Sequence, residues 1–480
     1  MPTAPENQKN DSAENLLPRR IHWEYPYGLM AIYRITDYEA RADGKTDNRI
    51  AIQKAIDTCH EAGGGRVLIP GPGVFVSGGI ELKSGVELHL EQRAVLKASP
   101  EFAAHNPLRP LSNNFNESSA ARLQDTEFSC FIIAKNAEDI VFSGPGTIDG
   151  NARAYRDSDL GPIYRMVANR PRLILLEGCQ RITARDITIR DGSYWTFHPI
   201  GCKDVLIDGI RIYNDLKTPN CDGIDPDHCQ NVRIANCHVE AGDDAIVLKN
   251  HGSYPEFGPC ENITITNCTL ISTSAAFKIG TESCGHFRNI AVSNCMIDRS
   301  NRALSIQLRD WGNVENVFFS NIAIRTRLFD NLWWGKAEPI AITAQPRREG
   351  DSIGTIRGVH FSNIRAEGEA GVLVWASPEA HIEDISFDNV AITLVKTTGH
   401  PCGWKDLRPT SGDEHGGCDR HPLHGFLLEN LHQVALRNCR VRFAENRHAP
   451  AEGKPESWTG ALFEKNNHGL QVENLQEDGL

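Results

Sequence analysis

A six-residue phrase that recurs along most of the chain limits the available folds more than any other feature. The phrase reads apolar, any residue, apolar, any residue, Asn, small apolar, and neighbouring early copies start 23 to 31 residues apart. A regular period of this length is typical of a protein built from stacked repeats. The clear copies occupy residues 232–237, 263–268, 290–295, 317–322, 359–364, 385–390 and 434–439, and weaker copies begin at Ile182 and Val205.

The period is too short for a repeat that contains a helix as well as strands, but it fits three short strands joined by three turns. That unit is one coil of a right-handed parallel β-helix, so the predicted fold class is all-β, a single-stranded solenoid. Copies of the phrase would stack at the strand spacing of ~4.8 Å. We expect the repeated Asn to form an amide ladder at one turn, through Asn236, Asn267, Asn294, Asn321, Asn363, Asn389 and Asn438.

The rest of the chain divides around this repeat. Residues 1–30 are polar and predict a flexible tail, and residues 31–480 predict one β-helix domain. A helix after Asp47 would place Ile52, Ala55, Ile56 and Cys59 on one face and cap the open first coil. The repeat lapses at loops near residues 101–127, 325–358 and 396–425, which are expected to form walls of a groove.

Composition excludes some classes of partner. The formal net charge is -12 and basic residues form no runs, which argues against nucleic acid as a partner. No apolar run is long enough to cross a membrane. The start of the chain has no signal-like apolar segment, so the sequence as written predicts a cytoplasmic location, or a secreted or periplasmic one if a leader was removed. No pattern in the sequence defines an oligomeric state.

The fourteen cysteines are interpreted as small buried residues rather than ligands or disulfides. Four of them share a column in which other coils carry Ile or Val. A zinc site is the alternative in the late loop, but the spacings there match no usual ligand pattern, so no metal or cofactor is predicted. The loop residues concerned are His400, Cys402, His415, Cys418, His421 and His424.

Residues 220–249 carry the densest cluster of acids. The segments Asp222-Gly-Ile-Asp and Asp244-Ala-Ile-Val flank a short apolar alternation, as if one coil were laid on the next. We therefore expect Asp222 and Asp244 to be neighbours in space, with Asp243 beside them. A Gly-Asp-Asp turn of purely structural importance is the alternative for residues 242–244.

Three coils align without gaps, so the columns of the stack can be compared directly. Strand alternation predicts inward columns, namely Ile246, Phe277 and Leu304, and Leu248, Ile279 and Ile306. The positions between them are predicted to face water, as the columns Asp225, Val247, Lys278, Ser305 and Asp227, Lys249, Gly280, Gln307. A polar strip beside an acid cluster on a rigid sheet predicts a polysaccharide-binding groove.

Crowded carboxyl groups suit glycoside hydrolysis, which needs one protonated carboxyl at the leaving oxygen and one carboxylate that activates water. Like charges a few ångströms apart raise one pKa while the others stay ionised. Asp222, Asp243 and Asp244 are therefore the predicted catalytic residues.

The motifs around these acids resemble glycoside hydrolase family 28, the polygalacturonase and rhamnogalacturonan hydrolase family. They are TDYEARADGKTDN, GPGTIDG, YWTFHP, NCDGID in place of the family's Asn-Thr-Asp, and GDDAI, together with the repeat. The resemblance implies a pectin-lyase-like β-helix without a metal. It also implies that Asp243 is the general acid, that Asp222 and Asp244 hold the attacking water, and that the anomeric carbon is inverted.

The chain departs from the polygalacturonase pattern at two places. Ser274, Ala275 and Ala276 stand where that group has Gly-His-Gly, and 305–307 reads Ser-Ile-Gln where it has Arg-Ile-Lys. These departures bear on galacturonate recognition rather than on hydrolysis, and Lys278, Arg302 or Arg309 would restore a cation. The predicted substrate-binding residues are Asp225, Lys278, Arg302, His198, Lys249, Glu282 and Trp334.

Some of these residues have a structural alternative. His198 is equally well explained as a buried residue, and Trp333 and Trp334 as core anchors of a loop. Trp195 is a further candidate for stacking on a sugar.

The leading prediction is an inverting hydrolase of pectin-related or other acidic oligosaccharides that releases terminal sugars. One alternative is a polysaccharide lyase on the same scaffold, with the three aspartates binding Ca²⁺ and Lys278 or Arg302 removing a proton. Another is a carbohydrate-binding solenoid without activity.

Overall fold

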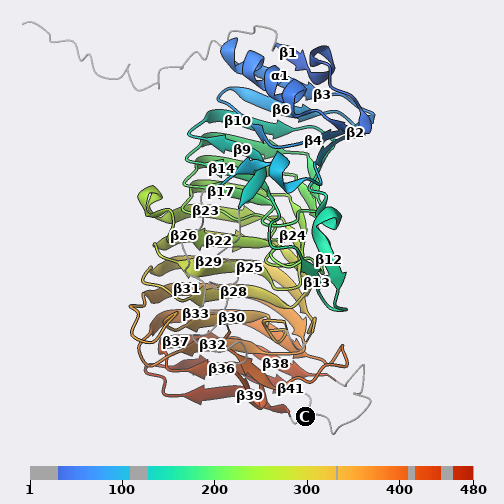
Figure 1. Ribbon diagram of the computed structural model, residues 1–480. Helices are drawn as coiled ribbons and strands as arrows, with labels where there is room; N and C mark the ends of the chain where they lie inside the picture. The colour runs from blue at the N-terminus through green and yellow to red at the C-terminus, as the bar shows by residue number, and fades with distance from the viewer. Residues whose placement is uncertain (1–30, 109–127, 331–332, 409–416, 445–457, 479–480) are drawn as a thin grey trace, which may run out of the picture.

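The computed structural model describes residues 31–108, 128–330, 333–408, 417–444 and 458–478. It shows a parallel β-helix whose coils follow one another in chain order from the N-terminal to the C-terminal end (Figure 1). The coils turn in the right-handed sense that connections between parallel strands favour. The predicted fold class is confirmed, whereas the tail predicted at residues 1–30 lies outside the described residues.

Most coils contribute one strand to each of three faces. The first face consists of β1 (Ile32–Arg34), β3 (Gly65–Ile69), β6 (Val86–Leu90), β10 (Glu138–Ser143), β15 (Gln180–Arg185), β18 (Lys203–Asp208), β20 (Gln230–Ala235), β23 (Cys260–Thr266), β26 (Phe287–Ser293), β29 (Val314–Thr326), β31 (Thr355–Gly368), β33 (His381–Leu394), β37 (His432–Arg437) and β40 (Gln471–Glu473). The last parts of β29, β31 and β33 continue into the second face.

The second face carries the shorter strands of each coil. They are β2 (Asp43–Asp47), β4 (Gly73–Ser77), β7 (Ala94–Ala98), β11 (Thr147–Asp149), β16 (Thr188–Arg190), β19 (Arg211–Tyr213), β21 (His238–Ala241), β24 (Thr269–Ser272), β27 (Met296–Ser300), β38 (Arg440–Phe443) and β41 (Gln476–Asp478).

The third face carries the candidate site. Its strands are β5 (Ile80–Glu81), β9 (Ser129–Lys135), β14 (Arg172–Glu177), β17 (Phe197–Ile200), β22 (Ile246–Asn250), β25 (Ala275–Ser283), β28 (Arg302–Leu308), β30 (Ile340–Ala344), β32 (Val372–Ala376), β36 (Leu423–Glu429) and β39 (Trp458–Lys465). Residues 222–227 bridge β17 to β22 through single residue pairs.

The register of the first face follows the six-residue phrase. The phrase starts pair directly from coil to coil, from Ile182 with Val205 through to Ile385 with Val434. The predicted amide ladder is present, because the side-chain amide of Asn363 donates to Asn321 at 3.1 Å and that of Asn389 donates to Asn363 at 2.7 Å. Every Asn of this column has a left-handed backbone, which Asn tolerates well.

A second amide ladder was not predicted. It runs one residue before the phrase, through Asn231, Asn262, Asn289 and Asn316. Asn recurs at that position in the sequence, so the same periodicity would have indicated it. The first ladder lies at the turn from the first to the second face, and the second lies near the start of the first-face strands in the middle of the stack.

Replacing Asn363 with Ala should destabilise the protein by about 2 kcal/mol. The change removes two ladder hydrogen bonds and places a residue with an ordinary Cβ at a φ of 55°. Chemical denaturation of both proteins would measure the loss of unfolding free energy. Asn363→Gly is the matched control, because it removes the ladder bonds but tolerates the backbone and should be the milder change. Equal stability of wild type and Asn363→Ala would contradict the importance of the ladder.

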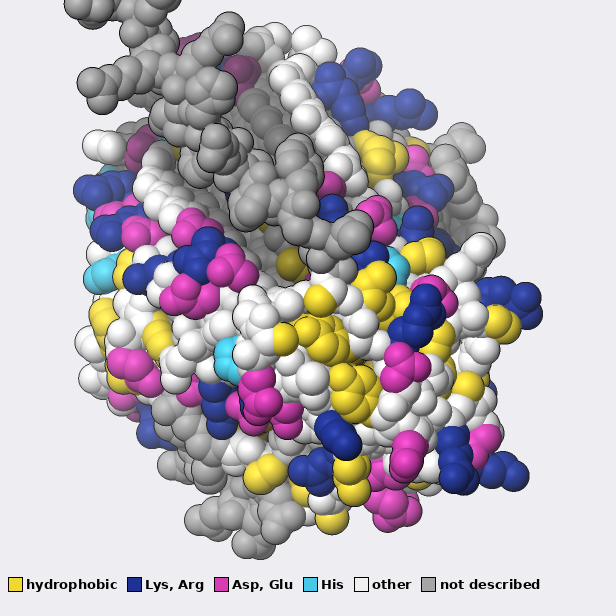
Figure 2. Space-filling view, turned by 90° about the horizontal axis from the view of Figure 1, so that it is seen from above, with side chains coloured by type: hydrophobic (Ala, Val, Ile, Leu, Met, Phe, Trp, Pro, Cys, Tyr) yellow, Lys and Arg dark blue, Asp and Glu magenta, His cyan; other side chains and the backbone are white. Residues whose placement is uncertain are grey.

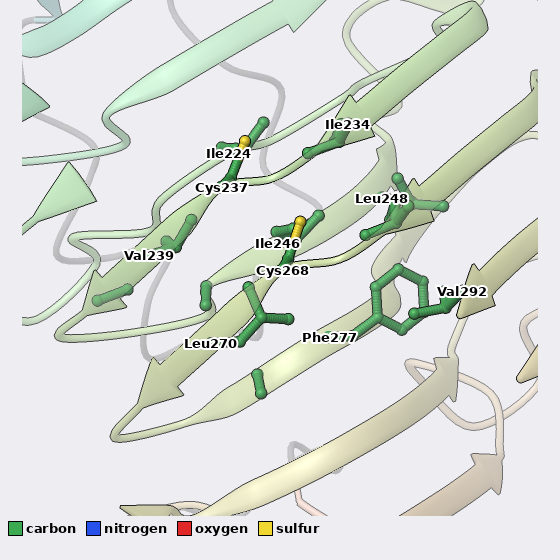
Figure 3. Packing of buried hydrophobic residues seen from close by; sticks show 14 of the residues in the cluster. Ile224, Ile234, Cys237, Val239, Ile246, Leu248, Cys268, Leu270, Phe277 and Val292 are labelled. Carbon is green, nitrogen blue, oxygen red and sulfur yellow. The ribbon is translucent and has the colours of Figure 1, made fainter. Parts of the chain in front are cut away.

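The core is a set of side-chain columns (Figure 3). Both predicted inward columns are buried, and Figure 3 shows Ile224, Ile246 and Phe277 in successive coils. Further along, the rings of Phe319, Phe361 and Phe387 stack with centroids 4.8 and 5.0 Å apart. Cysteines contribute in the same way, as Cys237 and Cys268 in Figure 3, and all fourteen thiols are free.

The N-terminal end of the stack is covered by α1 (Arg49–Glu61), as predicted (Figure 1). Its buried residues are Ala51, Ile52, Ala55, Ile56 and Cys59. The N-cap is Asn48 rather than Asp47. The Asp47 carboxylate nevertheless accepts hydrogen bonds from the amides of Arg49 and Gly78, and so joins the helix to the first coils.

Two of the predicted loops contain regular structure. Strand β30 lies within residues 325–358 and pairs with β28 and β32, so part of that range belongs to the stack. Within 396–425, β34 (Trp404–Asp406) and β35 (Cys418–Arg420) form an antiparallel pair. The apolar pattern missed β30 because its neighbours in sequence do not follow the phrase. Most of the loop predicted at 101–127 lies outside the described residues.

Smaller elements complete the described chain. They are β8 (Asn106–Pro107), β12 (Arg156–Asp159), β13 (Tyr164–Met166) and the 3-10 turns η1 (Ile35–Tyr38), η2 (Phe102–Ala104), η3 (Ala152–Tyr155) and η4 (Pro255–Phe257). Among the described residues, none of the helices has the length and apolar character needed to span a membrane. Figure 2, seen from above, shows acidic and basic side chains interspersed rather than separated by sign on the coloured surface.

Candidate active site

The third face aligns the predicted acids in neighbouring coils. Ile224 pairs with Ile246, and the Gly223 amide donates to the Asp244 carbonyl at 2.9 Å. Asp222 and Asp244 therefore occupy the same position of successive coils, as predicted. Extending this register in both directions gives the acid column, which we define as Arg172, Trp195, Asp222, Asp244, Ala275 and Arg302.

Asp243 lies at the turn that leads into β22 and is half-buried. Its Oδ2 accepts a hydrogen bond from the Asn220 amide at 3.2 Å, and its carbonyl accepts one from the Ser272 hydroxyl at 2.6 Å. Burial, followed by the charges of Asp222 and Asp244, raises the pKa of Asp243 well above its usual range. This carboxyl is thus suited to carry a proton at neutral pH.

Asp244, the next residue, has a different environment. Its Oδ2 accepts a hydrogen bond from the Lys278 ammonium at 2.8 Å, and its Oδ1 accepts one from the Ala275 amide at 3.0 Å. Both partners donate, and one carries a full positive charge. This is the arrangement of an ionised carboxylate.

Lys249 lies among three further acids. Its Nζ is 3.5 Å from Asp222 Oδ2, 3.7 Å from Asp225 Oδ1 and 3.4 Å from Glu282 Oε2. Burial followed by Asp225 raises the pKa of Asp222 well above its usual range, and burial raises that of Asp225 to about 7 against the effect of Lys249. Burial raises the pKa of Glu282, but the positive charges of Lys249 and Arg347 lower it by more, so its pKa lies below the usual range. One ammonium group thus offsets part of the negative charge of these three carboxyl groups.

The outward columns have the predicted register but do not face bulk water. Lys278 pairs in register with Val247 and Ser305, yet these three residues are only 7%, 0% and 1% exposed. Lys249 and Gln307 in the next column are 3% and 4% exposed. The prediction of an open, water-facing strip is therefore wrong, because other segments cover this face.

The cover on the C-terminal side is the segment 406–408. The carbonyl of Asp406 accepts a hydrogen bond from Arg302, that of Leu407 from Arg309, and that of Arg408 from Gln307. On the N-terminal side an apolar cluster covers the sheet, and its members are Cys130, Ile133, Leu175, Trp195, Ile200 and Tyr254, with Leu108, Phe128, Tyr194 and Phe257 packed against them.

His198 lies in a buried polar chain beside the acids. Its Nδ1 is 2.9 Å from Arg172 Nη1 and its Nε2 is 3.3 Å from Asp227 Oδ2. Burial lowers the pKa of His198 to about 3, against the effect of Asp227. For Asp227, burial alone would raise the pKa, but the hydrogen bond with His198 and the nearby His228 lower it to about 2. The structure thus holds His198 neutral, between a guanidinium and a carboxylate.

These two shifts predict loss of stability in acid. Asp227 has a folded pKa below its unfolded value of 3.8, so its contribution is present above pH 3.8 and is lost as the pH falls towards 2. His198 stays neutral in the fold, so unfolding gains from its protonation below pH 6.5. Asp227→Asn should cost about 2 kcal/mol at pH 7, and the difference from wild type should shrink between pH 4 and pH 2. Thermal unfolding across this range is the measurement, and a constant difference would contradict it.

The remaining predicted substrate ligands differ in their availability. Arg302 is 3% exposed, and its Nε and Nη2 donate to the two carboxylate oxygens of Glu338 at 3.1 and 3.3 Å. We therefore assign Arg302 no part in substrate binding. The indole of Trp334 is 46% exposed, and its backbone is fixed by a hydrogen bond from Asn301 to its carbonyl.

The ring of Trp195 is occupied by cations. Arg172 Cζ and Lys249 Nζ each lie 4.4 Å from its centroid, and the indole is 4% exposed. It therefore orients two cations beside the acids instead of offering a free face to a sugar.

Arg172 is the residue of this site that sequence reasoning missed. It lies two coils before Asp222 in the acid column. Continuing the column of Asp244 and Asp222 back through Trp195 would have reached it.

Metal chemistry has little support in the donor set. Within the described part of the chain, no group of three or more His, Cys, Asp or Glu side chains is arranged to hold a metal ion. Lys249 and Lys278 also place ammonium groups against the acids that a Ca²⁺ site would use. The same holds for the described cysteines and histidines of the late loop, which form no such group. His415 lies outside the described residues.

Comparison with known proteins shows the family of this chain. The family model described as Glycosyl hydrolases family 28 matches residues 59–403. The chain belongs to this family. A protein from Vitis vinifera named probable polygalacturonase is 31% identical over 260 residues, which covers 52% of each chain. An endo-polygalacturonase from Pectobacterium carotovorum subsp. carotovorum is 26% identical and is covered over 60% of its length.

Solved family 28 structures share the fold. The exopolygalacturonase of Yersinia enterocolitica superposes with a TM-score of 0.68 at 19% identity, covering 94% of this chain and 79% of that one. The Thermotoga maritima exopolygalacturonase gives 0.63 at 23% identity, covering 76% and 87%. The chain spans about half the length of the first curated relatives it matches.

Proposed function

We propose that this family 28 protein is an inverting glycoside hydrolase that acts on pectin-related or other acidic oligosaccharides. Asp243 is the general acid, and Asp222 and Asp244 hold the attacking water. The observation that carries the proposal is the unlike environment of two adjacent carboxyls. Asp243 has a raised pKa, while both oxygens of Asp244 accept hydrogen bonds, one of them from Lys278.

The reaction follows from this asymmetry. Asp243 donates its proton to the glycosidic oxygen as the bond to the anomeric carbon breaks. A water held by Asp244 and Asp222 attacks the opposite face of the sugar and gives its proton to Asp244. The product at the anomeric carbon then has the inverted configuration, and Asp243 regains its proton from solvent.

Two observations support the proposed substrate class, namely the names of similar proteins and the positive charges at the site. Relatives that match this chain are named polygalacturonases, which supports a pectic substrate. Lys249, Lys278 and Arg172 bring positive charge to a site rich in carboxyls, which suits an anionic sugar chain.

Cleavage near a chain end is supported by the cover on the third face. The segment 406–408 is tied by hydrogen bonds to Arg302, Gln307 and Arg309, two coils beyond Asp244. A long polysaccharide cannot pass over sheet positions that backbone already occupies. We therefore expect terminal sugars to be released.

Product analysis with a panel of plant and algal oligosaccharides tests the function. We expect new reducing ends, no ultraviolet-absorbing unsaturated sugar, and monosaccharides among the first products detected by mass spectrometry. Activity should survive a chelator. An unsaturated product together with chelator sensitivity would favour a lyase, and mid-chain fragments as first products would contradict terminal release.

A further inference from the structure

We propose that Arg172 forms a subsite for the carboxylate of an acidic sugar unit, at the N-terminal end of the acid column. The inference rests on the proposed function and specifies which residue recognises the negative charge of the substrate. Hydrolysis by the three aspartates does not require Arg172 to contact the sugar. The proposed function and the proposed subsite can therefore fail separately.

The acid column has an arginine towards each end. Arg302, on the C-terminal side, donates through Nε and Nη2 to both oxygens of Glu338. Arg172, on the N-terminal side, has no carboxylate of a described residue bonded to its Nε or Nη2. The edge of the guanidinium that comprises Nε and Nη2 is the one that grips a planar carboxylate with two parallel hydrogen bonds.

That edge of Arg172 is buried without a partner. The residue is 1% exposed, and neither Nε nor Nη2 donates a hydrogen bond to any described residue. Buried polar groups are nearly always hydrogen-bonded, and an unpaired buried cation is particularly costly. A ligand that supplies two oxygen atoms would complete the site.

The neighbours of Arg172 hold this edge in place. Its Nη1 is bonded to His198 Nδ1 at 2.9 Å, and His198 is in turn held by Asp227. The indole of Trp195 lies under the guanidinium, with 4.4 Å from Cζ to the ring centroid. A guanidinium fixed on one edge and one face loses little freedom on binding.

The position matches a sugar chain that extends from the acids. Arg172 is two coils before Asp222, which corresponds to ~10 Å at the strand spacing. The opposite direction is closed by segment 406–408, and the guanidinium of Arg302 there is already paired with Glu338. The anionic sugar unit therefore binds on the N-terminal side of the aspartates.

The experiment compares trigalacturonate with its fully methyl-esterified form in wild type, Arg172→Gln and Arg172→Lys. For Arg172→Gln we expect kcat/KM on the acid to fall ~10- to 100-fold, and kcat/KM on the ester to change less than about threefold. Arg172→Lys keeps the charge but not the paired donors, and should lie between. Arg233→Gln, which removes an exposed arginine of β20, is the matched control and should change neither value.

Calorimetric binding of trigalacturonate, measured in the Asp243→Asn background, gives a readout that needs no turnover. Weaker binding of the acid but not of the ester on loss of Arg172 supports the subsite. An equal change for acid and ester, or none, would overturn it and leave Arg172 as a structural guanidinium satisfied by water. If Arg172→Gln does not fold, equal binding of acid and ester by the protein with Arg172 intact would overturn it. Absence of any hydrolysis by wild type would instead overturn the proposed function, while the binding result still decides the subsite.

Discussion

Asp243→Asn should lower kcat by ~10²- to 10⁴-fold while the protein stays folded and still binds its substrate. Asparagine has nearly the same shape and its carbonyl oxygen can still accept the hydrogen bond from the Asn220 amide. It cannot donate a proton to a leaving glycosidic oxygen. Steady-state kinetics on the best oligosaccharide substrate would separate the effects on kcat and KM, and the loss should appear in kcat.

Asp157→Asn is the matched control, because Asp157 is exposed on β12 and is not part of the acid column. It should leave both kinetic constants unchanged. If Asp243→Asn altered affinity and nothing else, the protein would be a carbohydrate-binding solenoid and the proposed acid would be wrong. Circular dichroism of each variant excludes misfolding as the cause of a loss.

Lys278→Met should be the second most damaging change, with kcat/KM reduced by ~100-fold or more. The ammonium of Lys278 is the only charged donor that the described structure gives to Asp244, and both side chains are buried. Without it, the buried carboxylate keeps only the Ala275 amide as a partner. The attacking water would then lose a well-placed base, and kinetics on the same substrate would show this chiefly in kcat.

Arg at position 278 should recover part of the activity, because it restores a cation beside Asp244 although its shape differs. Lys203→Met, at an exposed position at the start of β18, is the control for loss of a lysine and should be silent. If Lys278→Met raised KM for acidic substrates and left kcat unchanged, Lys278 would be a substrate ligand rather than a partner of Asp244.

The stack and the meeting of the acids could be predicted because both depend on periodicity. A residue in one coil pairs with its counterpart in the next, as Val205 does with Val232. The similar segments 222–225 and 244–247 pair in the same way and place Asp222 beside Asp244. The inward and outward assignment of Phe277 follows from strand alternation in the same way. These are local rules that repeat, and one good alignment of coils defines many contacts.

The cover over the third face could not be predicted, because it comes from residues outside the repeat. Gln307 and Arg309 are bonded by carbonyls of 407–408, about a hundred positions later in the chain. The sequence offers no partner for Arg302, which was therefore predicted as a substrate ligand. In the structure Glu338, from a segment outside the repeat, pairs with it. The periodicity of the repeat cannot predict partners that come from outside the repeat.

The identity of the charge partner of Asp244 shows the same limit. Alignment of columns placed Lys278 on the outward side and suggested a cation for substrate. Only the side-chain conformation shows that its ammonium reaches back to the preceding coil and bonds Asp244 Oδ2. The predicted position was right, and the role we propose for it is different.

We propose that Asp243 and Asp244 act from opposite sides of one glycosidic bond. Proton NMR of the first product released from a defined oligogalacturonide, recorded before mutarotation equilibrates the anomers, tests it most directly. An inverting mechanism predicts a reducing sugar of β configuration from an α-linked substrate. Release of the α anomer, or of an unsaturated sugar, would contradict it.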